Sequence, residues 1–369
     1  MSKRFTGALL VGAALYAYVL AAQPKARQTG NVIFVMTDGL RWQEVFAGAA
    51  PALMNKEAGG VTDVDTLKHA YWRETPQARR EALMPFLWSQ VASQGQIYGN
   101  REKGSEAYVT NGLNFSYPGY SETLCGFADG RIDSNDKKPN PNVTVLEWLF
   151  QKPAFHDRIA AFGAWDTIPY IVNAPRSGIF ANAGYDPLTA IPLTPSLAML
   201  NRMKVELPKV WDGEPFDAVT FHSAAEYLKA RKPRVLYLSL GETDEWAHAG
   251  NYTEYLHAAH RVDAYLKTLW DWAQSTPEYR GKTTLVFSPD HGRGATASDW
   301  KSHGEKQPES KYIWMAFLGP DTHAMGERGN IGAVTQNQIA ATFASLLGED
   351  YATAVPKAGK PIADVVKLR

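Results

Sequence analysis

The stretch Thr284–Gly292, with the sequence TLVFSPDHG, decides how the rest of the chain is interpreted. Its apolar, β-branched residues predict a buried strand, and this strand ends directly on Asp290 and His291. A carboxylate oxygen and an imidazole nitrogen at one strand end make half of a divalent-metal site. An isolated Asp-His pair is also ordinary on a protein surface. The interpretation therefore depends on how many other strands end in the same way.

Two further stretches repeat the arrangement. Residues 31–37 predict a buried strand followed by Asp38, and residues 234–240 predict another that leads to Asp244 and His248. If a helix begins near Asp244, the four-residue spacing places Asp244 and His248 on one helical face. In a parallel sheet all of these side chains meet beyond the carboxyl ends of the strands, where ligands bind.

Two more polar residues lie on loops that reach the same edge. His303 follows the opening strand, and Ser116 lies in a loop rich in Gly, Asn and Pro. Each residue alone has an ordinary alternative role, as a turn residue, a helix cap or a surface histidine. Together they offer enough ligands for two cations roughly 3.5–4 Å apart. The set is Asp38, Ser116, Asp244, His248, Asp290, His291 and His303.

Buried strands that alternate with helices predict an α/β fold with a mostly parallel central sheet and helices on both faces. Two segments look irregular: residues 43–76, and a Pro- and Gly-rich surface segment at 174–195. The remaining expected strands are residues 95–99, 158–163 and 312–318, and the expected helices are residues 78–93, 143–150, 216–230, 252–273 and 336–347, with a short helix after the loop at 111–122.

The N-terminus has the order of a secretory signal peptide over residues 1–22. Lys3 and Arg4 precede an apolar stretch from Phe5 to Ala22 that ends on small residues. An uncleaved membrane anchor is the alternative, because the apolar run approaches spanning length. We predict export to the periplasm or the extracellular space, a polar linker at residues 23–30, and a single domain over residues 31–369.

Composition narrows the possible partners. The 369-residue chain has 38 basic and 38 acidic side chains, so no basic surface for nucleic acid is indicated. Its single cysteine, Cys125, excludes an intrachain disulfide and is expected to be a small core residue. The predicted partner is a small-molecule phosphate ester, and a membrane is involved only if the N-terminal segment stays uncleaved.

These motifs, taken in order, resemble the alkaline phosphatase superfamily of binuclear metallohydrolases. Phe115-Ser116-Tyr117-Pro118 is similar to the nucleophile loop of its phosphodiesterase branch, with serine in place of the usual threonine. Asp38, the Asp244/His248 pair and Asp290-His291-Gly292 resemble the metal motifs. Ser302-His303-Gly304 resembles the last histidine motif, at a distance from Asp290 typical of the mutases and some sulfatase-like members.

The resemblance implies a ligand set and a mechanism. Asp38, Ser116, Asp290 and His291 would hold one metal, and Asp244, His248 and His303 the other. Zinc suits these ligands, and manganese is possible. Ser116 would be the nucleophile of a covalent phosphoserine mechanism, with Ser121 the alternative. Asn135 matches, by its distance from Ser116, an asparagine that contacts a phosphoryl oxygen in the phosphodiesterase branch.

The chain also departs from the pattern of the family that it resembles. Tyr120 stands where formylglycine sulfatases have arginine, and Glu242 is at the wrong spacing for the third, magnesium site of alkaline phosphatases. No arginine clamp for a monoester dianion can be assigned among Arg131, Arg176, Arg293 and Lys301. The sequence predicts a metal-dependent phosphomonoester or phosphodiester hydrolase. A sulfate-ester hydrolase, a phosphosugar mutase and a non-catalytic anion-binding protein remain alternatives.

Overall fold

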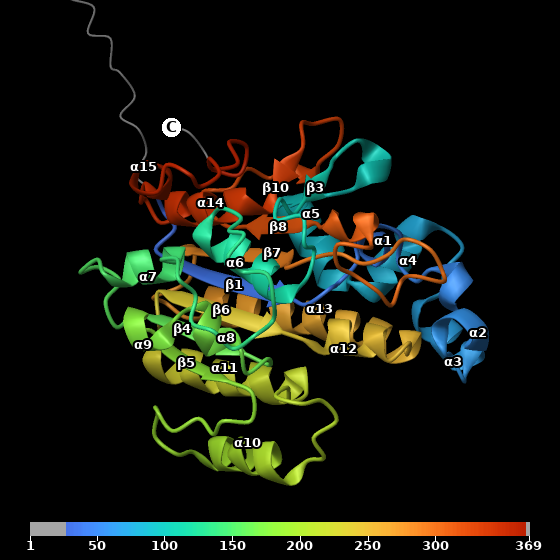
Figure 1. Cartoon of the computed structure of the whole chain (residues 1–369), viewed down its shortest axis with the longest axis horizontal. Coiled ribbons are helices and arrows are strands. Elements are labelled where there is room, and N and C mark those ends of the chain that lie inside the picture. Colours follow the sequence, from blue (N-terminus) through green and yellow to red (C-terminus); the bar gives the residue numbers. More distant parts are fainter. Residues whose placement is uncertain (1–26, 367–369) are drawn as a thin grey trace, which may run out of the picture.

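The structure is a computed structural model that describes residues 27–366, and an eight-stranded sheet runs through its centre (Figure 1). The strand order is β5-β4-β6-β1-β7-β8-β2-β9. All pairs are parallel except those that β8 makes with β7 and β2. The strands are β1 (Asn31–Thr37), β2 (Gln96–Tyr98), β4 (Ile159–Gly163), β5 (Phe180–Ala183), β6 (Val235–Leu240), β7 (Thr283–Pro289), β8 (Met315–Leu318) and β9 (Gly326–Glu327). A separate pair joins β3 (Ala107–Tyr108) and β10 (Val334–Thr335).

The three central strands end level with one another. In the register of β1, Thr37 lies opposite Leu240 of β6 and Pro289 of β7. Every residue of these three strands is buried, as their near-continuous apolar runs predict. The residues that follow them are therefore delivered to one edge of the sheet.

Helices cover both faces of the sheet (Figure 1). Alternate residues of β1 serve the two sides, with Ile33 and Val35 in one apolar cluster and Val32, Phe34 and Met36 in the other. The first side is covered by α1 (Trp42–Ala47), α3 (Val64–Tyr71), α4 (Pro76–Leu83), α11 (Asp217–Arg231) and α13 (Tyr252–Ser275); the second by α6 (Ser116–Cys125), α7 (Val145–Phe150) and α14 (Ile339–Leu346). This confirms the α/β prediction.

The segment 43–76, expected to be irregular, contains short helices. Besides α1 and α3 it holds α2 (Lys56–Gly59), and Asn55 and Asp63 cap α2 and α3 by accepting hydrogen bonds from Ala58 N and Thr66 N. Helices this short show no sustained apolar periodicity, so the caps were the only sequence signal for them.

The segment 174–195 also carries structure that its composition concealed. It contains α9 (Ala174–Ser177) and the edge strand β5, and α10 (Pro195–Glu206) follows it, packed outside α11 (Figure 1). In the described part of the chain β5 pairs only with β4, and two of its four residues are partly exposed. An edge strand of this kind lacks the continuous apolar run by which the central strands are recognised.

The single helix expected over 78–93 is interrupted at Pro85. α4 ends at Leu83, a π-turn covers Leu87–Val91, and α5 (Ala92–Gln94) follows. The freed backbone N–H groups of Phe86 and Leu87 donate to the buried Asp263 carboxylate at 2.7 and 2.8 Å. A proline removes a helical hydrogen bond, and here a distant side chain replaces it.

The predicted signal peptide, residues 1–22, and residues 23–26 of the predicted linker lie outside the described residues. Within residues 27–366 no helix is long and apolar enough to cross a membrane. The backbone N–H groups of Gln28 and Thr29 donate to the Asp321 carboxylate at 2.8 and 2.7 Å, which fixes the start of the described chain to the domain.

Candidate metal centre

The ends of β6, β1 and β7 bring the predicted ligands together. The backbone N–H of Asp38 donates to Leu240 O at 2.9 Å, and that of Asp290 donates to Thr37 O at 3.2 Å. Both aspartates thus extend the hydrogen-bond ladders of the central strands. Asp244 lies in the first turn of α12 (Glu242–His248), which starts directly after β6.

Asp38, Asp290 and His291 form what we call the first ligand group. His291 Nε2 lies 3.1 Å from Asp38 Oδ1 and 3.4 Å from Asp290 Oδ2. All three of these atoms are buried, and none has a hydrogen-bond partner among residues 27–366. Such atoms are costly inside a protein unless something binds them. Two carboxylate oxygens and one imidazole nitrogen converging on a common point fit a divalent cation of the zinc type.

The protonation of His291 supports this interpretation. Its Nδ1 lies 2.8 Å from the carbonyl oxygen of Gly292, so Nδ1 carries the proton and Nε2 presents a lone pair. Burial lowers the pKa of His291 to about 4. Burial and the neighbouring Asp244 raise the pKa of Asp38 to about 7, and burial and Asp38 raise that of Asp290 well above its usual range. Burial and mutual repulsion thus oppose the ionisation of both carboxyl groups, and the nearby Arg293 lowers the pKa of Asp38 only in part. A bound divalent cation would favour their charged forms.

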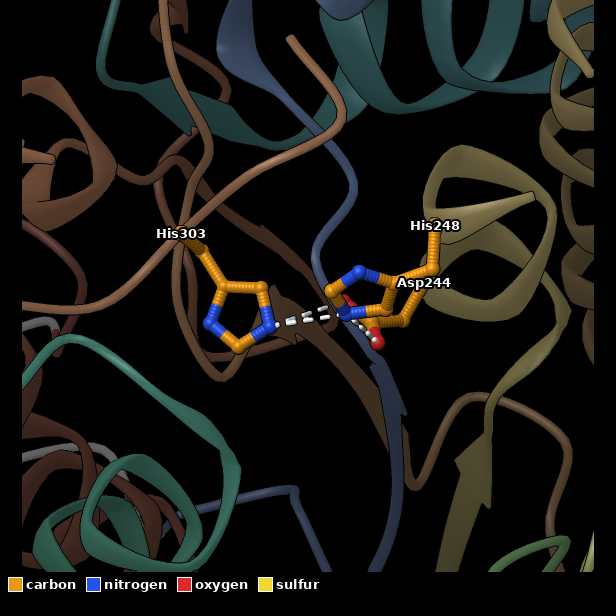
Figure 2. A group of neighbouring side chains, drawn as sticks. All are labelled: Asp244, His248 and His303. Carbon is orange, nitrogen blue, oxygen red and sulfur yellow. Dashed lines mark hydrogen bonds and ion pairs between the residues drawn. The ribbon is translucent and has the colours of Figure 1, made fainter. Parts of the chain in front are cut away.

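Asp244, His248 and His303 form the second ligand group (Figure 2). His248 Nε2 lies 2.9 Å from Asp244 Oδ2 and 3.0 Å from His303 Nε2, and His303 Nε2 lies 3.6 Å from Asp244 Oδ1. The two imidazoles approach from different elements, α12 and the loop after β7. The His248 side chain is 46% exposed, so this group is the more open of the two.

The two groups adjoin each other. The rings of His291 and His303 stack with centroids 4.0 Å apart, and Asp244 Oδ1 lies 3.9 Å from His291 Nε2. The structure therefore brings six of the seven predicted ligand side chains into one continuous cluster. The seventh, Ser116, requires separate consideration.

Ser116 is the first residue of α6, and α6 is docked on the first ligand group. A Cβ atom added to Gly119 would lie 2.4 Å from the carbonyl oxygen of Asp290, so the first turn of the helix rests on that backbone. Tyr120 donates from its hydroxyl to Asp38 Oδ2 at 3.2 Å. Ser116 itself is buried, at 6% exposure. The nucleophile predicted from sequence thus begins the helix that contacts both aspartates of this group.

Asn135 and Ser121 lie on different sides of α6. Asn135 Oδ1 accepts a hydrogen bond from the backbone N–H of Tyr117 at 3.0 Å, which places its amide group at the start of α6 next to Ser116. Ser121 accepts from Asn140 Nδ2 at 3.2 Å and lies 3.7 Å from Cys125 Sγ, inside the core. Cys125 is fully buried, as expected for a small core residue.

Arg293 occupies a place that the sequence did not indicate. It is 1% exposed, donates to Asp244 Oδ1, and is held by the carbonyl oxygens of Lys301 at 2.7 Å and Trp300 at 3.2 Å. Burial acts to raise the pKa of Asp244, but Arg293 and His303 outweigh it and hold that pKa well below its usual range. Arg293 is thus a fixed cation on Asp244. Gly39, at φ +59°, leaves room for this pair, since a Cβ there would lie 2.7 Å from Asp244 Oδ1.

The other cationic residues considered as a clamp bind elsewhere. Arg131 pairs with Asp129 and Arg176 with Glu147, while Lys301 is an exposed residue beside Gly250. Glu242, at the wrong spacing for a third metal, accepts from the backbone N–H of Asp217 at 2.8 Å and pairs with Arg261. The Glu242 carboxylate in α12 therefore links this helix to α11 and α13 through these two contacts.

Glu214 is a buried carboxyl group that sequence reasoning missed. A Cβ atom on Gly241, the residue between β6 and α12, would lie 1.3 Å from Glu214 Oε1. Burial and the nearby Asp38 raise the pKa of Glu214 well above its usual range. Glu214 belongs to no motif and lies 30 residues before Asp244 in the chain, so no local pattern predicted its place.

No protein-family model matches the chain, and no curated protein sequence matches it. Solved structures do match. The alkaline phosphatase PafA superposes with a TM-score of 0.58 at 11% identity, over 93% of this chain and 100% of that one. BT1596, a 2-O GAG sulfatase, superposes with a TM-score of 0.55 at 15% identity, over 90% of this chain and 73% of that one. The lipoteichoic acid synthase LtaP from Listeria monocytogenes superposes with a TM-score of 0.56 at 13% identity, over 88% of this chain and 73% of that one.

The architecture is α/β, and the carboxylates and imidazoles gathered at the strand ends form a candidate metal centre. The chain has the fold of the alkaline phosphatase superfamily, which confirms the resemblance drawn from the motifs at the level of the fold. At 11–15% identity the similarity concerns the fold, and the chemistry must be argued from the residues.

A first prediction concerns stability. Because the first ligand group contains three buried atoms without partners, a bound cation should stabilise the folded state over the unfolded one. At a Zn²⁺ concentration 100 times the dissociation constant, the gain is about 2.7 kcal/mol, and Tm should rise by about 4 °C. Differential scanning calorimetry of chelator-treated protein, with and without Zn²⁺, measures this. His257→Ala, on α13 outside the site, should show the same rise, and an unchanged Tm in the wild-type protein would contradict the metal centre.

Proposed function

We propose that the protein is an exported, binuclear-metal-dependent hydrolase of phosphate esters that works through a covalent phosphoserine on Ser116. The observation that carries the proposal is the convergence of Asp38 Oδ1, Asp290 Oδ2 and His291 Nε2, buried and unpartnered, under the helix that begins at Ser116. Two divalent cations, Zn²⁺ or alternatively Mn²⁺, would bind to the first and second ligand groups, with Ser116 added to the first.

The donor set fits those cations. Once bound, divalent cations supply Lewis acidity, which lowers the pKa of a coordinated hydroxyl and offsets the charge of a transferring phosphoryl group. The protein's own contribution to the reaction is to position the nucleophile and the substrate. Ser116 begins α6, the helix that contacts Asp38 and Asp290, and would present its hydroxyl to the first ligand group. Asn135 lies at the same helix start, where it would contact a phosphoryl oxygen. Ser116 Oγ forms the new P–O bond as the bond to the leaving alcohol breaks, and water later releases phosphate from the serine.

Phosphate is favoured over sulfate by the residue at position 120. Formylglycine sulfatases, which the nucleophile loop resembles in part, have arginine there, whereas Tyr120 is hydrogen-bonded to Asp38 and Ser239. A sulfate-ester hydrolase remains the second candidate, because a 2-O GAG sulfatase is among the structures that share the fold.

A phosphosugar mutase fits less well. Such an enzyme needs a cap domain between the nucleophile and Asp244. Here that part of the chain supplies β4 and β5 to the main sheet and the helices α7, α10 and α11 to its surroundings. The substrate is expected to be a small-molecule ester, since the neutral charge balance offers no surface for a nucleic acid.

An activity panel tests the proposal. Purified protein loaded with Zn²⁺ is assayed on an aryl phosphate monoester, an aryl phosphodiester and an aryl sulfate, with chelator-treated protein and Mn²⁺-loaded protein beside it. We expect phosphate-ester hydrolysis that is lost with the metal and restored by adding it back. Metal bound without hydrolysis of any ester would favour the non-catalytic anion-binding protein. If the aryl sulfate is hydrolysed faster than both phosphate esters, the protein is a sulfatase and the phosphatase assignment is wrong.

A further inference from the structure

Tyr120 is a residue of the site that the mechanism above does not use. It lies four residues after Ser116 in α6, so the two side chains share one face of the helix. Tyr120 is fully buried. Its hydroxyl donates to Asp38 Oδ2 at 3.2 Å and lies 2.8 Å from Ser239 Oγ, which is thereby the donor to the tyrosine oxygen. One phenol therefore joins α6, the end of β1 and the end of β6.

This contact decides which oxygen Asp38 offers. With Oδ2 engaged by Tyr120, the carboxylate presents Oδ1, the atom that has no partner and lies 3.1 Å from His291 Nε2. Asp38 is thus oriented as a ligand through one oxygen. Groups of this kind, which hydrogen-bond a ligating carboxylate, fix its orientation and tune metal affinity.

The same helix is fixed on the other aspartate as well. Gly119, adjacent to Tyr120, rests on the backbone of Asp290, and a Cβ there would lie 2.4 Å from the Asp290 carbonyl oxygen. The Tyr120 ring packs beside Trp165, with centroids 6.2 Å apart. A shift of α6 along its axis would therefore disturb both aspartates, so the position of Ser116 is coupled to theirs.

We propose that Tyr120 is a positioning residue that orients Asp38 as a one-oxygen metal ligand and keeps the Ser116 helix in register with it. This deepens the proposed function and rests on it for the role of Ser116, whereas the role toward Asp38 concerns metal binding alone. The direct test therefore measures metal binding rather than turnover.

Tyr120→Phe removes only the hydroxyl and keeps the ring in place. Zn²⁺ titration of the chelator-treated protein by calorimetry should show about 10–100-fold weaker binding at one of two sites, with the other unchanged. The absorption spectrum of the Co²⁺-loaded protein should change at the same site. For ester hydrolysis, kcat should fall more than KM changes, because the altered contact lies behind the ligand rather than against the substrate.

Tyr351→Phe is the matched control. Tyr351 is equally buried, and its hydroxyl is shared between Cys125 O at 3.0 Å and Val143 O at 3.2 Å. The variant therefore loses buried hydrogen bonding that has no link to the metal ligands. It should bind Zn²⁺ as the wild type does. Ser239→Ala removes the donor to the Tyr120 oxygen. It should weaken Zn²⁺ binding at the same site as Tyr120→Phe does, but by a smaller factor. It replaces Tyr120→Phe as the test variant if Tyr120→Phe folds poorly.

The outcomes separate this inference from the proposed function. Wild-type affinity at both sites and an unchanged Co²⁺ spectrum in Tyr120→Phe would overturn the role of Tyr120, even if the wild-type enzyme hydrolyses phosphate esters. Weakened metal binding in the variant supports that role, even if the wild-type protein hydrolyses none of them. Wild-type protein that binds no divalent cation would overturn both.

Discussion

Replacing His291 by alanine is expected to remove metal and turnover together. His291 Nε2 is the only nitrogen in the first ligand group and lies between Asp38 Oδ1 and Asp290 Oδ2. Without it, two buried carboxylates remain to hold the cation, and one equivalent of Zn²⁺ should be lost on dialysis. A cation contributes several kcal/mol of transition-state stabilisation, and each 1.36 kcal/mol is tenfold in rate, so kcat/KM should fall on the order of 10³-fold or more.

Metal content by mass spectrometry and steady-state kinetics on the best ester of the panel provide the measurement. His260→Ala is the matched control, because His260 is a half-buried histidine on α13 that binds the carbonyl oxygen of Leu83 at 2.8 Å and lies outside the site. It should keep its metal and its rate. A His291→Ala protein with unchanged metal content and unchanged kcat/KM would mean that the centre of the site has been assigned to the wrong residues.

The fold and the ligand cluster were predictable because both follow from periodic, local signals. A buried parallel strand is a continuous apolar run, and three such runs end in Asp38, in the Asp244/His248 helix and in Asp290-His291. Parallel strands end at a common edge, so the spatial cluster follows from the strand assignment alone. The i, i+4 spacing placed Asp244 and His248 on one face, and the structure has their side chains 2.9 Å apart.

The residues that support the ligands could not be predicted in this way. The sequence assigns no role to Arg293, because nothing in DHGRG indicates that the chain folds its guanidinium back onto Asp244. Tyr120 was noticed only as a missing arginine, and the direction of its hydroxyl depends on how α6 docks against β1 and β6. Glu214 reaches Gly241 from a loop that is held by Tyr185, whose hydroxyl donates to the carbonyl oxygens of Trp211 and Glu214, and no local pattern in the sequence indicates this contact. Such contacts depend on tertiary packing rather than on local pattern.

Ser116→Ala is expected to abolish the covalent step while leaving most of the metal centre in place. The variant loses the hydroxyl that would attack phosphorus, but keeps the six carboxylate and imidazole side chains of both ligand groups. Loss of a nucleophile that works as one unit with other catalytic groups lowers kcat by about 10⁴-fold or more. The second ligand group should bind Zn²⁺ with wild-type affinity, and the first somewhat more weakly.

Acid-quenched wild-type enzyme should carry one phosphoryl group on the tryptic peptide 104–131, located to Ser116 by fragmentation, and Ser116→Ala should carry none. The same peptide contains the control. Ser121 faces the core, where Asn140 donates to its hydroxyl at 3.2 Å, so Ser121→Ala should still be phosphorylated and keep its rate apart from a small loss of stability. Label on Ser121, or full activity in Ser116→Ala, would refute the assignment of the nucleophile. Because Ser116 shares the helical face of Tyr120 and Ser121 lies in the core, the two variants together test which side of α6 carries the nucleophile.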